Sequence, residues 1–306
     1  MVDGSDWTAA RDKFMAQRTG TTQDDPNMEL LLSAIVHIPS VMETANGLNG
    51  GWTPGTLEHW ARNTPVAKYA FDYAGQALNV ATDGLTGIYA EIVLALAMPN
   101  FALLTLARQV SESALRARWL LDDLTPNGLV TRGYAVAWQE AQTQRTFTHQ
   151  AIDYGLITSK DEPAARQKVS DRSAELTVEG RAHRLLKRKD GKELPILTMP
   201  VMTELFRDIR NGPVGPSGNQ DMRWLYSLLS GVAHGRTWAA IHASIPTIVQ
   251  EYLNYTDEGI KPSGTVLARS DPSTMNIVLA IQVGLLNTLD AIGCFQRARQ
   301  LTGPAP

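Results

Sequence analysis

The stretch Met222-Arg-Trp-Leu-Tyr-Ser-Leu-Leu-Ser-Gly-Val-Ala-His-Gly235 has the spacing of an α-helix with one polar face. Its polar residues recur at i, i+4, i+7 and i+11, and eleven residues return a helical side chain to within about 20° of its starting direction. The residues that share this face are Arg223, Ser227, Ser230 and His234. Leucines on the flanks predict a mostly buried helix over residues 221–243. Since a buried polar group needs a partner or serves a site, this stripe is the first candidate site.

Helical periodicity continues through most of the 306 residues, and β-signals are sparse. The sequence therefore predicts an all-α, multi-helix bundle. Further helices are expected over residues 6–18, 29–45, 54–82, 86–98, 99–124, 126–155, 163–187, 202–210, 246–255 and 273–301. Residues 193–197 are either a short strand or irregular. We expect three regions: an N-terminal helical region (1–85), a helical core (86–301) and a disordered tail (302–306).

Composition indicates a cytoplasmic protein. Cys294 is the single cysteine, which suits a reducing compartment. The first 14 residues have no apolar signal-peptide core. The most apolar run, residues 92–107, is about 16 residues long, short of the roughly 20 that a membrane-spanning helix needs. We therefore expect no membrane partner. A net charge of −3 disfavours a general nucleic-acid coat but leaves room for a local basic patch.

Arg108 and Glu112 form an i, i+4 pair on an otherwise apolar helix. One interpretation is a structural salt bridge that ties two helices together. The other is that the pair supports the Arg223–His234 stripe. In the second case His234 lies in one polar cluster with Arg108 or Glu112, between two apolar helices.

The pair and the stripe together resemble the HEPN superfamily of helical proteins. The resemblance lies in an Arg108-x-x-x-Glu112 helix followed by Tyr226-Ser-x-x-Ser-x-x-x-His-Gly235, and covers roughly residues 86–245. It implies an HEPN-like core and a homodimer. Many members are metal-independent endoribonucleases of toxin–antitoxin and phage-defence systems, so RNA and an antitoxin or other protein are the implied partners. Other members are non-catalytic binding proteins, which is the alternative here.

The active members carry Arg and His separated by four to six residues. Arg236-Thr-Trp-Ala-Ala-Ile-His242 has this spacing, with Thr237 where the family favours Asn, His or Asp. About one such match is expected by chance in this chain. The resemblance implies that His234 or His242 moves the proton of a ribose 2′-OH, while Arg236 or Arg223 holds the phosphate.

Two simpler interpretations of the stripe stay open. His234 is then a core histidine bonded to Ser230 or to a carbonyl, or the polar face only specifies helix packing. No HExxH, His-x-x-x-His or paired cysteines occur in the sequence, so we expect neither a metal nor another cofactor.

A basic segment precedes the stripe in the chain. Of the twelve residues Arg181-Ala-His-Arg-Leu-Leu-Lys-Arg-Lys-Asp-Gly-Lys192, seven are Arg, Lys or His and one is Asp. A solvated helix end is one explanation, because cations suit a helix C-terminus. The functional interpretation is an RNA-binding patch that contacts phosphates. Its residues are Arg181, Arg184, Lys187, Arg188 and Lys189.

Overall fold

The structure is a computed structural model that describes residues 26–94, 101–207, 209, 221–234, 236, 244–256, 259–272 and 274–304. The described residues are mostly helical, as predicted, with two antiparallel hairpins in addition. They form two compact units, each made of separate chain segments. Unit 1 comprises residues 1–47, 79–115 and 202–289, and unit 2 comprises 48–78, 116–201 and 290–306. This division differs from the predicted contiguous regions 1–85 and 86–301, because segments distant in sequence pack together in each unit.

Unit 1 is built mainly from helices. The described helices that lie wholly within it are α2 (Pro26–Ile35), α3 (Ile38–Asn46), α9 (Met202–Leu205) and α10 (Arg223–Ala233), with the π-helical turn η2 (Ala90–Leu94). The unit boundary falls inside three long helices, α5 (Lys68–Tyr89), α6 (Ala102–Leu121) and α12 (Thr274–Gln300). The expected helix at residues 6–18 lies outside the described residues.

Glycines allow three helices of unit 1 to approach one another closely. A Cβ added at Gly84 of α5 would lie 2.7 Å from Val110 Cγ2 of α6, and one added at Gly284 of α12 would lie 2.8 Å from Val110 Cγ1. Val110 is buried. Because real Cβ contacts are longer than this, only glycine fits on both sides of Val110 without movement of the helices.

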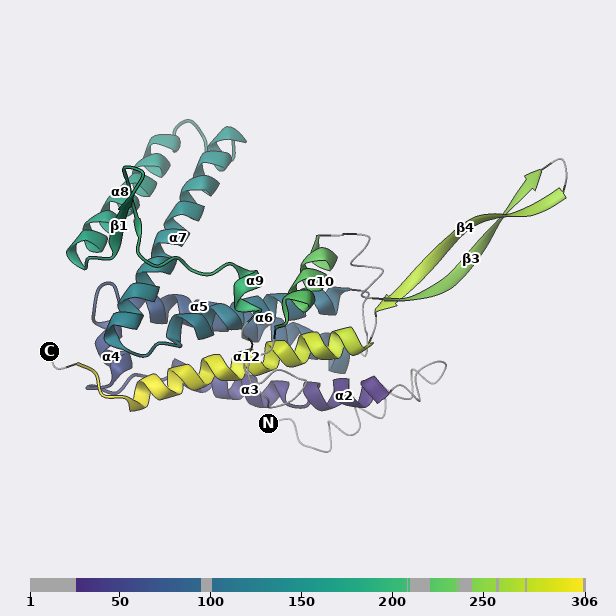
Figure 1. Cartoon of the computed structure of the whole chain (residues 1–306), viewed down its shortest axis with the longest axis horizontal. Helices are drawn as coiled ribbons and strands as arrows, with labels where there is room; N and C mark the ends of the chain where they lie inside the picture. Colours follow the sequence, from purple (N-terminus) through teal and green to yellow (C-terminus); the bar gives the residue numbers. More distant parts are fainter. Residues whose placement is uncertain are drawn as a thin grey trace. The chain divides into compact units, whose positions relative to one another are not determined.

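A long hairpin over residues 244–272 replaces the helix predicted at residues 246–255. Strand β3 (Ser244–Thr256) pairs with β4 (Gly259–Pro272) in antiparallel register from Ser244↔Pro272 to Thr256↔Gly259, with two irregularities. Figure 1 shows the two strands as one extended ribbon. The segment 244–256 contains isoleucines, a valine and tyrosines, which favour strands. The helical prediction was therefore wrong.

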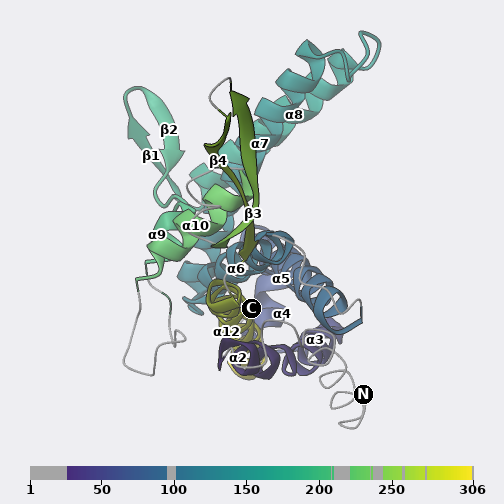
Figure 2. The ribbon, with the colours of Figure 1, turned by 90° about the vertical axis from the view of Figure 1, so that its right-hand side faces the viewer.

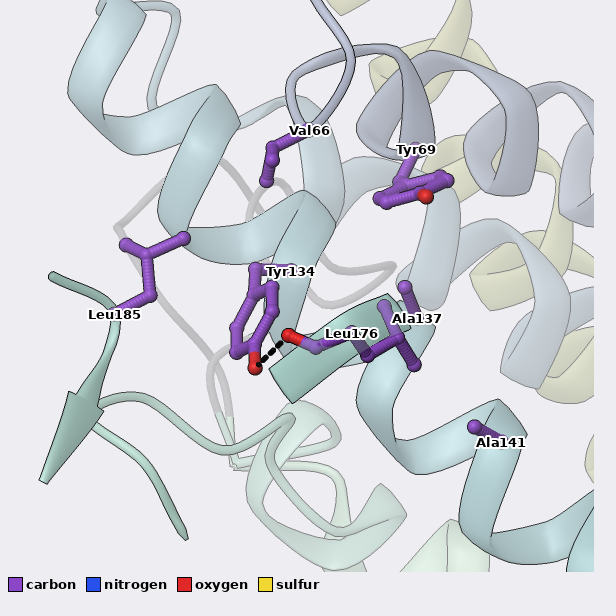
Figure 3. Packing of buried hydrophobic residues seen from close by; sticks show 7 residues of the cluster. All are labelled: Val66, Tyr69, Tyr134, Ala137, Ala141, Leu176 and Leu185. Carbon is purple, nitrogen blue, oxygen red and sulfur yellow. Dashed lines mark hydrogen bonds between the residues drawn. The ribbon is translucent and has the colours of Figure 1, made fainter. Parts of the chain in front are cut away.

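Unit 2 contains α4 (Leu57–Arg62), α7 (Pro126–Asp153), α8 (Glu162–Ala182) and the hairpin of β1 (Leu186–Lys189) and β2 (Lys192–Pro195). Helices α7 and α8 run antiparallel as neighbours (Figure 1). Their core cluster includes Tyr69, Tyr134 and Leu176 (Figure 3). The Tyr134 hydroxyl donates a 2.8 Å hydrogen bond to the Leu176 carbonyl, so its polar end is satisfied inside the core.

A buried ion cluster joins α4 to the end of α12 within unit 2. Glu58 is 0% exposed and accepts hydrogen bonds from Arg62 Nε at 3.0 Å and from Arg299 Nε at 2.7 Å. A short backbone contact lies next to it. Thr302 forms a β-bridge with Thr56, and the Gly303 N–H donates to the Gly55 carbonyl at 2.9 Å. Residues 302 and 303 are thus bonded to the fold, which corrects the prediction of a disordered tail there.

Among the described helices, α12 alone combines the length and the apolar composition of a membrane-spanning segment. Its segment Met275–Gln300 is long and apolar enough to cross a membrane, and 67% of the most apolar window is buried inside the structure. A buried core helix of a water-soluble protein has the same length and composition.

Candidate nucleic-acid interface

The polar stripe of α10 faces solvent. Helix α10 ends at Ala233, with His234 as its C-cap, rather than continuing to residue 243. Arg223, Ser227 and His234 are exposed, whereas Leu225, Leu228 and Leu229 on the other face are buried. The prediction that the stripe lies on a buried face was therefore wrong, as was the alternative of a core histidine. Exposed polar groups are solvated, so the stripe needs no buried partner.

Arg223 is paired with a residue just before the helix. Its Nε and Nη2 donate to the two carboxylate oxygens of Asp221, with the Nη2 contact at 2.6 Å. These bonds hold the pKa of the Asp221 carboxyl at about 2, below its ordinary value. The guanidinium that was expected to hold a phosphate is thus already bonded to a carboxylate.

Arg108 and Glu112 form an ion pair within α6, rather than one that ties two helices together. Arg108 Nε lies 2.6 Å from Glu112 Oε1, and the two side chains are 18% and 21% exposed. The Arg108 guanidinium lies 5.9 Å from the ring centroid of Tyr226 on α10. Among the described residues, no hydrogen bond or ion pair joins His234 to this pair. The pair therefore contacts α10 through Tyr226, and no bond among the described residues supports the cluster predicted around His234.

Two candidate catalytic residues follow the end of α10. The His234 N–H donates to the Ser230 carbonyl at 3.0 Å, and the Arg236 N–H donates to the Gly231 carbonyl at 2.8 Å. Both residues are exposed, and within the described part of the chain neither side chain has a hydrogen-bond or ion-pair partner. His242 lies outside the described residues. The predicted Arg236–His242 arrangement therefore stays a prediction.

The basic segment contains both the end of α8 and most of a β-hairpin that follows it. Helix α8 stops at Ala182, because Arg184 adopts a left-handed backbone with φ 57°. The Leu185 N–H donates to the Gly180 carbonyl at 2.7 Å and the Arg184 N–H to the Arg181 carbonyl at 3.2 Å, which is a Schellman cap. Strand β1 then pairs with β2 around the turn at Asp190 and Gly191, both of which have positive φ.

The register of this hairpin places three lysines on one face. Cross-strand partners share a face and neighbours along a strand alternate, and the pairs are Leu186↔Pro195, Lys187↔Leu194, Arg188↔Glu193 and Lys189↔Lys192. Lys187, Lys189 and Lys192 therefore point the same way, and all three are exposed. No carboxylate in the described part of the chain pairs with any of them. We call these residues the lysine face.

The opposite face of the hairpin is turned toward its own unit. Leu186 packs against the core cluster, and Pro195 is buried. Glu193 accepts hydrogen bonds from Nε and Nη2 of Arg181, the shorter at 2.8 Å. This pairing lowers the pKa of the Glu193 carboxyl and raises that of the Arg181 guanidinium. Figure 2 shows the hairpin as a separate two-stranded ribbon.

The hairpin changes the membership of the predicted patch. Arg181 is bonded to Glu193, and Arg188 lies opposite Glu193, so neither is an unopposed cation. Arg184 is exposed at the end of α8. Lys192 was missing from the predicted patch, although an Asp-Gly pair between two short polar-apolar alternations is a hairpin signal that would have placed it opposite Lys189.

Comparison with family models, curated proteins and solved structures finds no match for this chain.

Proposed function

We propose that this protein binds RNA through the lysine face of the β1–β2 hairpin. The observation that carries the proposal is the placement of Lys187, Lys189 and Lys192 on one exposed face without paired carboxylates. Three of the chain's eight lysines are concentrated there, in a protein whose net charge is −3. Unpaired cations contribute to polyanion binding because they release counterions from phosphates, whereas cations already paired contribute less.

The spacing of the face also suits a phosphate backbone. Side chains at i and i+2 on a strand are separated by about 6.6 Å, given a rise of about 3.3 Å per residue, and Lys192 widens the row across the hairpin. Contacts to phosphates position a protein without reading base sequence. RNA is the polymer that the HEPN resemblance implies, and the proposed binding is independent of sequence.

The test is a comparison of two triple variants by fluorescence anisotropy with a labelled single-stranded RNA. Unit 2 holds six lysines, three on the hairpin and three elsewhere, and all six are exposed. We expect Lys187→Gln/Lys189→Gln/Lys192→Gln to weaken binding by about tenfold or more. The matched control, Lys68→Gln/Lys160→Gln/Lys168→Gln, removes the same charge and should bind like wild type. Equal losses in the two variants would contradict a hairpin site.

A second proposal, favoured by the exposed side chains of His234 and Arg236, is metal-independent cleavage of the bound RNA by a homodimer. In this reaction a histidine takes the proton of a ribose 2′-OH, and O2′ attacks the adjacent phosphorus. The P–O5′ bond breaks, and the leaving O5′ receives a proton, so a 2′,3′-cyclic phosphate and a 5′-OH result. The Arg236 guanidinium balances charge on the phosphate.

The cleavage proposal is tested with separate His234→Ala and His242→Ala variants in EDTA. A general acid or base contributes about 10²–10⁴-fold, so one variant should lose that much activity while its circular dichroism is unchanged. Sedimentation at micromolar concentration should give a dimer. RNA binding without cleavage by the wild type would leave a non-catalytic RNA-binding protein and remove this second proposal.

A further inference from the structure

A second concentration of cationic and hydroxyl groups lies between α7 and α8, apart from the residues considered above. A hollow of about 290 Å³ is lined by Arg145, Thr148, His149, Arg166, Ser170 and Ser173, with one valine. None of these lining residues is acidic. We propose that this hollow binds a small phosphorylated molecule, such as a phosphomonoester.

The contacts of Arg166 explain how the hollow is held together. Its Nε lies 2.8 Å from Glu162 Oε1, and its Nη1 lies 3.0 Å from His149 Nδ1. Arginine has no acceptor, so Arg166 donates and His149 Nδ1 accepts, which leaves the imidazole proton on Nε2. Arg166 thus joins α8 to α7, and the Nε2–H of His149 remains as a further donor.

Arg145 supplies the charge that the hollow leaves unbalanced. It is exposed on α7, and no carboxylate among the described residues pairs with it. Ser170 adds a hydroxyl group from α8, whereas the Ser173 hydroxyl already donates to the Val169 carbonyl at 3.0 Å. A planar guanidinium with nearby hydroxyl and imidazole donors matches the several acceptor oxygens of a phosphoryl group.

A second hollow on the other side of α8 provides a contrast. It is lined by residues of both signs, Lys168, Asp171, Arg172 and Glu175, together with Gln144 and Gln167. Its four charged residues sum to zero, and two of them form an ion pair, since Arg172 Nη1 lies 2.6 Å from Glu175, while Gln167 donates to Asp171 at 2.6 Å. Of the two hollows, the one beside Arg145 combines unbalanced positive charge with a hydroxyl group.

The size of the hollow favours a small ligand over a polymer. Sites for drug-sized ligands have volumes of about 300–1,000 Å³, so 290 Å³ lies just below that range. One phosphoryl group with a small substituent fits this volume. The proposal is independent of RNA binding by the lysine face, which uses other side chains of unit 2.

Isothermal titration calorimetry with inorganic phosphate and with AMP, at constant ionic strength, tests the proposal. We expect saturable binding of at least one probe to wild type and a loss of about tenfold or more in Arg145→Gln. Arg145→Lys keeps the charge without the planar fork and should recover part of the affinity. The control Lys168→Gln removes a charge from α8 beside the other hollow and should bind like wild type.

Three results would overturn the proposal. The first is no saturable binding of either probe. The second is an equal loss in Arg145→Gln and Lys168→Gln, which would indicate a general charge effect. The third is Arg145-dependent binding of an RNA that lacks terminal phosphates, while neither small probe binds. This result would assign the hollow to the polymer. Because Arg145 is exposed, its variants should keep the circular dichroism of wild type.

Discussion

Glu58 and the lysine face place charge in opposite ways within unit 2. Glu58 is fully buried between Arg62 and Arg299, and its two carboxylate oxygens accept from both guanidiniums. Lys187, Lys189 and Lys192 are exposed and meet no carboxylate in the described part of the chain. Buried charge with matched partners fixes how segments pack. Exposed charge without partners contributes little to stability and is available to a ligand.

The largest effect on stability is expected from Glu58→Gln. This change leaves two arginines beside a buried neutral amide, and breaking a buried ion pair costs about 3–5 kcal/mol. Urea unfolding followed by circular dichroism measures the loss. The matched control is Glu193→Gln, whose partner Arg181 is exposed, and we expect this variant to unfold at nearly the same urea concentration as wild type. Similar costs for the two variants would show that burial does not separate these pairs.

Gly84→Ala is expected to have the next largest effect. The added methyl would meet Val110 Cγ2 at 2.7 Å, and overpacking of a core costs about 1–3 kcal/mol. Gly75→Ala in the same helix is the control, because nothing lies within 4 Å of its added Cβ. That variant should stabilise by about 0.5–1 kcal/mol, since alanine replaces glycine in a helix. Thermal unfolding should shift in opposite directions, and a shift in the same direction would contradict close packing at Val110.

Arg184→Gly separates an effect on the stability of the protein from an effect on RNA binding. Glycine adopts the left-handed backbone of position 184 without strain, which should stabilise the protein by up to about 1 kcal/mol. The same change removes an exposed cation near the lysine face and should weaken RNA binding only slightly. Urea unfolding and anisotropy on one sample separate the two effects. A destabilised Arg184→Gly variant would show that the side chain makes a needed contact.

The smallest effect concerns Asp221 and pH. The pKa of the folded-state carboxyl is about 2, below its unfolded value, because Arg223 donates to it. The pairing therefore stabilises the protein above the unfolded pKa, and this contribution is lost as pH falls from about 4 toward 2. Asp221→Asn should reduce the acid sensitivity of unfolding over that interval. The difference should shrink in high salt, because the pair is exposed, and an unchanged acid profile would contradict the bond.

Long helices were predicted from the sequence, whereas exposure and strand pairing were not. The expected helices at 126–155 and 273–301 match α7 and α12 within two residues, because Pro126 and continuous periodicity mark them. The α10 stripe was recognised from its spacing. Periodicity groups residues by helix face, but it does not predict which face is buried. The leucine face is covered in unit 1, where Phe206 and Tyr226 have ring centroids 5.0 Å apart.

Composition predicted a basic patch in this segment, but it did not predict which side chains share one face. Helical spacing would scatter residues 187, 189 and 192 around an axis, whereas strand alternation and pairing across a turn bring them onto one side. The left-handed residue that ends α8 is an arginine, so the usual glycine signal of a helix end is missing. The hollow beside Arg145 depends on two helices packing together, which no local pattern specifies.

The salt dependence of RNA binding tests the central claim most directly. The slope of log K against log salt concentration counts the phosphates neutralised, at about 0.7 per contact for a single strand. If the three lysines of the hairpin contact phosphates, the Lys187→Gln/Lys189→Gln/Lys192→Gln variant should have a slope shallower than that of wild type by about 2. The Lys68→Gln/Lys160→Gln/Lys168→Gln control should keep the wild-type slope. Identical slopes for all three proteins would contradict RNA binding by the lysine face.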